Sequence, residues 1–203
     1  MCAATQSQIL KSAQMTSLLC EFLERNAEFE MIYSNDANSN PAAFRSACSA
    51  CGPNVVLATL SNGRVIGGYS AQSWNGTNSH KPDPSSFIFL LDQPERKVVQ
   101  KAANINTSVY DHTSYYPAFG DGPELSFNAD HKVYVNLNGD TFNPTPEGPS
   151  FLLAGNSSLP FTRLEVLKVK PLTGIYIWPG CDQADKFLHD PAAIKAEILA
   201  ART

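Results

Sequence analysis

Apolar residues near the start of the chain recur every three or four positions, with polar residues between them. In residues 7–25 these positions are Ile9, Leu10, Ala13, Leu18, Leu19, Phe22 and Leu23. This periodicity is typical of a helix with one apolar face. We therefore expect an amphipathic helix over residues 7–25 that packs on the domain behind it. A coiled coil would need several sustained heptads, and this segment is too short to supply them.

Beyond this helix the pattern changes to short runs that favour strands. Residues 55–60 and 64–69 are β-rich runs joined by a turn that contains Asn62 and Gly63, which predicts a hairpin. Pro41 suits the first turn of a short helix that extends to residue 48. Further strands are expected at residues 28–34, 86–91, 97–100, 124–127, 132–137 and 162–170. Short strands separated by Pro-, Gly- and Asn-rich loops predict an α+β fold that is mostly β, a two-sheet antiparallel sandwich flanked by helices.

The length of 203 residues suits one core, and no internal repeat divides the chain. We expect an N-terminal helical arm at residues 1–28, a central domain at 29–170, and a C-terminal arm at 171–203. The last arm combines an aromatic turn, Tyr176 to Trp178, with a helical pattern. We expect the aromatic turn to dock on the domain and the final helix to bind a partner.

Residues 86–91 predict a strand that is buried on both faces. Phe87, Phe89 and Leu91 alternate onto one face, and Ile88 and Leu90 fill the other. The paired glycines Gly67 and Gly68 lie inside another predicted strand, where they permit a close approach of backbone.

Charge and hydropathy exclude several classes of partner. The formal net charge is −4, with 43% apolar and 17% charged residues and no run of Lys or Arg. Nucleic acid and anionic membranes select basic surfaces, so neither is an expected partner. No stretch approaches the roughly 20 apolar residues of a membrane helix. The first residues lack the pattern of a secretory signal, so we expect a cytoplasmic protein.

Catalytic motifs are missing from the sequence. Ser70, in Gly68-Tyr69-Ser70-Ala71-Gln72, lacks the second glycine of a nucleophile elbow, and no glycine-rich phosphate loop occurs. The carboxylates that could act as general acid and base show no spacing that singles out a pair; they are Asp83, Asp92, Asp121, Glu124 and Glu165. We expect a protein that is not an enzyme and needs no cofactor.

Cys48 and Cys51 form a C-x-x-C pair at the end of a predicted helix, where the helix dipole raises a thiol pKa. A zinc site would need two further ligands of suitable spacing. The remaining candidates show none; they are Cys2, Cys20, Cys181, His80, His112, His131 and His189. We expect no metal. Peroxide scavenging by Cys48 or Cys51 remains an alternative, and it requires an exposed thiol of low pKa.

Several segments, taken in order, resemble the TLDc domain family. They are residues 31–34, Phe44 with Cys48, Gly52 with Pro53, residues 62–69 with Trp74, residues 82–91, residues 119–122 and residues 164–166. The resemblance covers about residues 29–170 and extends to the preceding helix. The block that runs from Gly67-Gly68-Tyr69 through Trp74 to Phe87-Ile88-Phe89 carries most of it.

The resemblance implies a β-sandwich without an established active site. It also implies links to oxidation resistance and, in several members, to binding of the vacuolar proton ATPase. The residues that it marks as structural are Gly67, Gly68, Phe87, Phe89, Gly120, Gly122 and Glu165. Pro123 departs from the family pattern and removes a backbone donor from that loop.

These observations favour a non-catalytic module that binds a protein partner within a large complex. The expected partner-binding residues are Trp74, Asp121, Ile194, Ile198 and Leu199. The vacuolar ATPase is the leading partner, and a structural adaptor in an axoneme or similar cytoskeletal assembly is the alternative. We further expect Glu165 to cap backbone or hydroxyl donors near the strand of Gly67 and Gly68, because a buried carboxylate is costly unless paired.

Overall fold

The computed structural model describes residues 3–35, 40–94, 99–136, 141–142 and 152–171, with side chains from residue 6 onward. The described helices are α1 (Ala13–Phe22), α2 (Pro41–Cys48) and the short 3-10 helix η1 (Ile105–Thr107). The strands are β1 (Ala3–Thr5), β2 (Ala27–Ser34), β3 (Asn54–Leu60), β4 (Val65–Ser70), β5 (Ser79–Lys81), β6 (Phe87–Leu90), β7 (Val99–Lys101), β8 (Val109–Asp111), β9 (Tyr115–Phe119), β10 (Leu125–Asn128), β11 (Lys132–Tyr134) and β12 (Ser158–Pro171). The α+β, mostly β prediction is confirmed.

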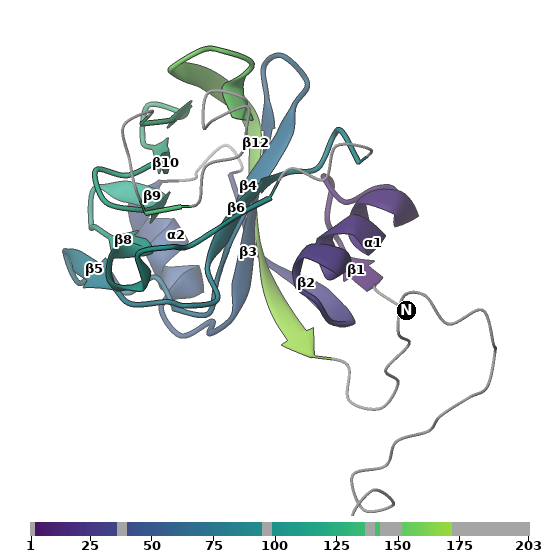
Figure 1. Cartoon of the computed structure of the whole chain (residues 1–203), viewed down its shortest axis with the longest axis horizontal. Helices are drawn as coiled ribbons and strands as arrows, with labels where there is room; N and C mark the ends of the chain where they lie inside the picture. The colour runs from purple at the N-terminus through teal and green to yellow at the C-terminus, as the bar shows by residue number, and fades with distance from the viewer. Residues whose placement is uncertain (1–2, 36–39, 95–98, 137–140, 143–151, 172–203) are drawn as a thin grey trace, which may run out of the picture.

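The strands follow one hydrogen-bonded path, in the order β5-β8-β9-β10-β11-β12-β3-β4-β6-β7. Strand β2 also pairs with β12, and β1 pairs with β2 in parallel; the other pairs are antiparallel. The 14-residue β12 joins the two halves of this path. Its first residues pair with β11, and the following residues pair with β3. Figure 1 shows β12 beside β3 at the centre of the molecule.

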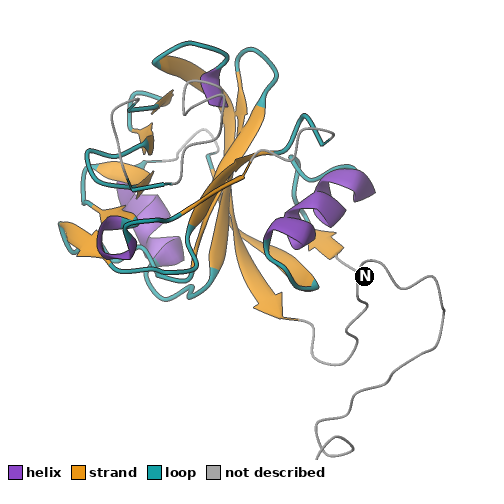
Figure 2. Ribbon diagram, in the orientation of Figure 1, coloured by secondary structure: helices purple, strands orange, loops and turns teal. Residues whose placement is uncertain are grey.

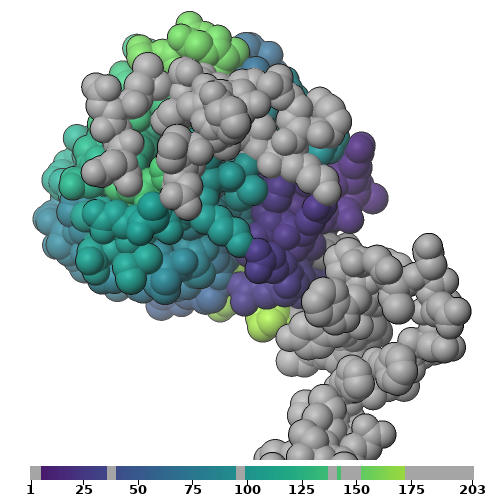
Figure 3. Space-filling model, in the orientation of Figure 1, coloured from purple at the N-terminus to yellow at the C-terminus, as the bar shows by residue number. Residues whose placement is uncertain are grey.

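Two apolar cores lie on opposite faces of the sheet that contains β3, β4 and β6. The first core lies between the two sheets, where Ile66 and Ile88 meet Phe119 and Phe127, and α2 adds Phe44. The second core lies between the outer face of the same sheet and α1. The two helices accordingly flank opposite sides of the strands (Figure 2), and α1 forms an outer layer of the molecule (Figure 3).

Strand β6 divides its side chains between these two cores as the alternation predicts. Ile88 and Leu90 belong to the core between the sheets, whereas Phe87 and Phe89, with Leu91 just beyond the strand, belong to the core under α1. All five are at most 3% exposed. The prediction of a strand buried on both faces is confirmed.

The N-terminal helix begins later than the apolar pattern predicts, at Ala13 instead of residue 7. Ser12 caps it by accepting a hydrogen bond from the backbone N–H of Met15, at 3.0 Å. Ile9 and Leu10 precede the helix, yet both are 6% exposed. Their burial explains why they continue the apolar pattern without being helical. The segment packs into the second core, so it is a layer of the fold and not a separate arm.

The short helix and the first hairpin match the sequence predictions. Helix α2 spans Pro41–Cys48, and its N-cap Asn40 accepts from the backbone N–H of Ala43 at 2.9 Å. Strands β3 and β4 are joined through the turn that contains Asn62 and Gly63. Strands β1, β5, β8 and β9 had not been predicted. Residues 172–203, with the predicted aromatic turn and final helix, lie outside the described residues. Within the described ranges, no helix has the length and apolarity needed to cross a membrane.

Candidate functional site

Asp121 lies in a tight loop between β9 and β10, and its side chain is 59% exposed. The flanking glycines have positive φ angles, 94° at Gly120 and 77° at Gly122. The loop backbone is tied to its neighbours at two points. Gly120 N–H donates to the carbonyl oxygen of Ser108 at 3.0 Å, and Asp121 N–H donates to Thr141 Oγ1 at 2.9 Å. This construction presents the Asp121 carboxylate to solvent from an ordered loop.

Glu124 lies beneath this loop and is only 1% exposed. One carboxylate oxygen accepts hydrogen bonds from the backbone N–H groups of Thr141 and Phe142. The other oxygen has no hydrogen-bond partner among the described residues. A Cβ atom at Gly120 would lie 1.5 Å from that oxygen, so the loop requires glycine there. Burial raises the pKa of Glu124 even though the two backbone N–H groups act to lower it.

A row of four half-exposed rings extends from the Asp121 loop across β5, β8 and the start of β9; we call it the ring surface. Its members are His80, Tyr110, His112 and Tyr115. His80 lies directly opposite Tyr110 on the neighbouring strand, with ring centroids 4.8 Å apart. The next centroid distances are 5.5 Å from Tyr110 to His112 and 5.0 Å from His112 to Tyr115.

The ring surface meets the Asp121 loop at His80. Nε2 of His80 lies 3.4 Å from Oδ1 of Asp121, and the His80 side chain is 32% exposed. The structure therefore brings together an exposed carboxylate and a row of aromatic side chains that are distant in sequence.

A buried carboxylate supports the strands that carry the ring surface. Asp111 accepts hydrogen bonds from the backbone N–H groups of Asn75, Gly76 and Thr77, and it pairs with the Lys81 ammonium at 2.6 Å. Burial alone would raise the pKa of Asp111, but the Lys81 and backbone hydrogen bonds lower it overall. This network joins the 75–77 loop, β5 and β8 into one unit.

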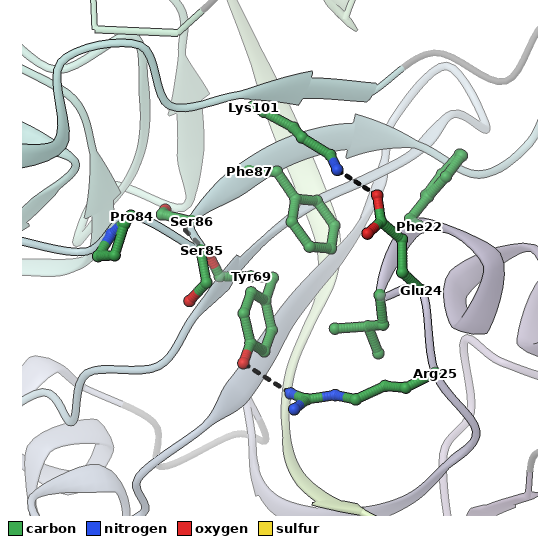
Figure 4. Close-up of a pocket in the computed structure, with 10 residues that line it drawn as sticks. Phe22, Glu24, Arg25, Tyr69, Pro84, Ser85, Ser86, Phe87 and Lys101 are labelled. Carbon is green, nitrogen blue, oxygen red and sulfur yellow. Dashed lines mark hydrogen bonds and ion pairs between the residues drawn. The ribbon is translucent and has the colours of Figure 1, made fainter. Parts of the chain in front are cut away.

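A separate hollow of about 350 Å³ lies beside the end of α1; we call it the α1 pocket. Residues from four segments line it: Phe22, Leu23, Glu24, Arg25, Tyr69, Pro84, Ser85, Ser86, Phe87 and Lys101. Figure 4 shows Lys101 and Arg25 on opposite sides of the Tyr69 and Phe87 rings. Those rings stack at 5.2 Å between centroids. The sequence had not singled out Arg25 or Lys101.

Trp74 lies in the core between the sheets and is 1% exposed. Its indole N–H donates to Asn54 Oδ1 at 2.8 Å, and its ring meets Phe119 edge to face. The indole itself is therefore a packing element and offers no surface to a partner. Partner binding by the surrounding loop stays a prediction.

The family-matched glycines of β4 permit the close contacts predicted for them. A Cβ atom at Gly67 would lie 2.1 Å from the carbonyl oxygen of Val56 on β3, and one at Gly68 would lie 2.6 Å from the Phe119 ring. Glycine at position 67 therefore lets the two strands pack without a side chain between them.

Glu165 is completely buried and paired, as predicted, but its partners are not near Gly67 and Gly68. Its carboxylate accepts hydrogen bonds from the Ser7 hydroxyl at 2.6 Å and from Gln8 N–H at 2.9 Å, and Arg163 completes the set. The carboxylate thus fixes the segment before α1 onto β12. The predicted location was wrong because β3 lies between Glu165 on β12 and Gly67 on β4, and the donors come from the segment before α1 and from β12 itself.

Cys48 and Cys51 are both free thiols, 0% and 6% exposed. A thiol–thiol hydrogen bond raises the pKa of Cys48, and burial adds to this rise. The same hydrogen bond lowers the pKa of Cys51, helped by Ser73 and nearby backbone N–H groups. Of the two features that peroxide scavenging requires, Cys51 has the lowered pKa but not the exposure. Cys20 is disulfide-bonded.

Among the described residues, no group of three or more His, Cys, Asp or Glu side chains is arranged to hold a metal ion. Of the predicted partner-binding residues, Asp121 is exposed and Trp74 is buried. Ile194, Ile198 and Leu199 lie outside the described residues.

The chain matches a known protein family. The family model described as TLDc domain matches residues 4–170, which includes α1 and nearly all of β12. A comparison with curated proteins finds no match.

Proposed function

Because the chain belongs to the TLDc domain family, we propose that it acts as a non-catalytic module that docks on a large protein complex. The observation that carries this proposal is the ring surface with Asp121 at its end. Aromatic side chains with polar atoms are enriched where proteins meet, because one ring supplies both apolar area and hydrogen bonds. The docking surface consists of Asp121, His80, Tyr110, His112 and Tyr115.

Three features of this surface suit docking. The rings are half-exposed and contact one another, so little side-chain entropy is lost when a partner covers them. The strands beneath are tied together by Asp111 and Lys81. The Asp121 carboxylate stands beside the rings and supplies a directional contact.

The vacuolar proton ATPase is the partner that the family suggests, and a role in oxidation resistance would follow from that association. Cytoplasmic placement is part of the same proposal. The adaptor alternative rested on helical arms at both ends of the chain. Helix α1 packs into the second core, so it is not available as an attachment arm without rearrangement. Peroxide scavenging finds no support in the burial of Cys48 and Cys51.

The test measures binding of the purified full chain to the purified vacuolar ATPase and, in parallel, to axonemal microtubule preparations. Tyr110→Ser and Asp121→Asn should each weaken binding to the ATPase by about tenfold, the loss expected of one central interface contact. Tyr134→Ser and Asp130→Asn are matched controls, because Tyr134 and Asp130 form an exposed pair on another part of the molecule.

Equal binding by all four variants would rule out the ring surface as the docking site. Binding to axonemes alone would replace the ATPase with the adaptor role. Melting temperatures of the variants should match that of the unaltered chain, since the substituted side chains are exposed or half-exposed.

A further inference from the structure

The α1 pocket has an unusual helix ending that places two charged side chains at its rim. Glu24 follows the last turn of α1 with a φ angle of 55°, in the left-handed region where glycine is usual. Glu24 N–H donates to the carbonyl of Glu21 at 3.0 Å, and Arg25 N–H donates to that of Cys20 at 3.2 Å. These two hydrogen bonds end the helix, and the side chains of Glu24 and Arg25 point toward the pocket (Figure 4).

Arg25 has most of its hydrogen-bonding capacity unused in the described part of the chain. Its guanidinium carries five N–H donors. One of its nitrogens donates to the Tyr69 hydroxyl at 2.8 Å, and the guanidinium carbon lies 5.8 Å from the centre of the Tyr69 ring. The ring contact orients the cation without neutralising it, so the fork remains able to bind a carboxylate.

Lys101 enters the pocket rim from β7 and is already paired with a carboxylate, that of Glu24. The two side chains are 57% and 71% exposed. Exposed ion pairs of this kind contribute little net free energy, so another carboxylate can replace Glu24 at small cost. The Glu24–Lys101 pair therefore shows that the cation at this rim binds a carboxylate.

The pocket contrasts in charge with the whole chain. Its rim carries two cations and one carboxylate, whereas the chain has a net charge of −4. The aromatic floor is nearly closed, since Tyr69 is 4% and Phe87 is 3% exposed. An apolar ligand would therefore gain little by entering, whereas an anionic ligand would meet the two cations Arg25 and Lys101.

We propose that the α1 pocket binds a ligand in which a short linker joins two carboxylates. Arg25 holds one carboxylate, and Lys101 holds the other after displacement of Glu24. The volume of about 350 Å³ is at the small end of the range for ligand pockets, which suits a molecule of this size. A free dicarboxylic acid and a pair of acidic side chains on a polypeptide present the same chemistry. This site is separate from the ring surface, and its test does not depend on docking.

The test is a titration of the full chain, labelled with ¹⁵N, followed through the amide signals of Arg25 and Ser85. The probes are glutarate, butyrate as the matched monocarboxylate, and a blocked Glu-Ala-Glu peptide. Glutarate should bind about two- to fivefold more tightly than butyrate, because its second carboxylate gains an exposed ion pair with Lys101. Added salt should weaken glutarate binding. Tighter binding of the peptide than of glutarate would identify a polypeptide source, and the reverse order a free acid.

Three variants move the affinity for glutarate in different directions. Arg25→Met and Lys101→Met should each lower it about two- to fivefold, to the level of butyrate. Glu24→Gln should raise it, because the internal competitor for Lys101 is removed. Lys132→Met is the matched control, since Lys132 is an exposed lysine beside Asp130 on β11. Equal affinity for glutarate and butyrate, or a Glu24→Gln variant that binds more weakly, would overturn the proposal.

Discussion

Buried carboxylates in this protein differ in how well their oxygens are paired. Glu165 receives donors from Ser7, Gln8 and Arg163, and Asp111 receives Lys81 together with a loop backbone. Glu124 receives two backbone N–H groups on one oxygen and none from the described residues on the other. An unpaired buried charge is costly, so the acid form of Glu124 is favoured in the fold.

Glu124→Gln should therefore change how stability depends on pH. The folded-state pKa of Glu124 lies above its unfolded value, so the unfolded chain releases this proton first as pH rises. Stability contributed by the protonated group is present at low pH and falls as pH rises through the folded pKa. The Glu124→Gln variant lacks this loss because its side chain cannot ionise. Its free energy of unfolding should therefore exceed that of the unaltered chain at pH 7, and the difference should shrink toward pH 4.

Urea unfolding at a series of pH values measures this difference. Glu21→Gln, which removes an exposed carboxylate on α1, serves as the control. The opposite result would be a stability difference between Glu124→Gln and the unaltered chain that becomes less favourable to the variant from pH 4 to pH 7. That result would show that Glu124 is ionised and paired in the fold.

Gly67→Ala should be more damaging than Gly68→Ala. The new Cβ at position 67 would meet a backbone oxygen of β3, which cannot move without separating the strands. We expect a loss of about 3 kcal/mol or more in the free energy of unfolding, the upper range for overpacking. At position 68 the obstacle is the edge of the Phe119 ring, which can shift. Chemical denaturation of both variants tests this order, and equal losses would contradict it.

Residue roles were predictable where the chemistry of one side chain decides them. A glycine pair in a strand implies close packing, and a carboxylate in an apolar strand implies paired donors; both hold at Gly67 and Glu165. The partners of Glu165 were not predictable, because Ser7 lies 158 positions away and nothing in its local sequence indicates that contact.

At the scale of elements, strand β6 shows how two cores share one sheet. Phe89 reaches the core under α1, where its ring lies 6.0 Å from that of Phe22. This contact links the helix layer to the sheet, so burial of α1 depends on the side chains that β6 presents.

Phe89→Ala should cost about 3–5 kcal/mol, the range for truncating a buried aromatic side chain. Thermal unfolding measures the loss. Ile105→Ala is the control, because Ile105 is 43% exposed, and it should change stability by less than about 0.5 kcal/mol. An unchanged melting temperature for Phe89→Ala would be incompatible with the packing of β6 against α1.

Elements with strong periodicity were predictable, and short polar ones were not. Alternation in residues 86–91 identified β6, and Pro41 marked the start of α2. Strand β5 consists of Ser79, His80 and Lys81, which carry no apolar run, so only pairing with β8 makes it a strand. The ring surface was missed for the same reason: His80 and Tyr110 are neighbours across strands and distant in sequence.

At the scale of the molecule, β12 is the strand that joins the two sheets. A chain that ends at residue 171 keeps β12 and every described contact, whereas a chain that ends at residue 157 loses it. We expect the first chain to unfold cooperatively at nearly the temperature of the full chain. The second should give no cooperative transition, because β2, β3 and β11 all lose a neighbour.

Circular dichroism during heating distinguishes the two truncated chains. If the chain ending at residue 171 also fails to unfold cooperatively, residues beyond β12 contribute to the core. The binding surface would then remain with the Asp121 loop and the ring surface.

The position of β12 also affects how the protein is made. During synthesis, β2, β3 and β11 leave the ribosome before β12, the strand that pairs with all three. The backbone edges that will face β12 are therefore unpaired until it emerges. Open edges of this kind attract strands from other chains, and contacts that span most of the sequence form slowly. Newly made chains should therefore depend on chaperones until β12 has emerged, and mutations that slow its pairing should lower the yield of protein more than its final stability.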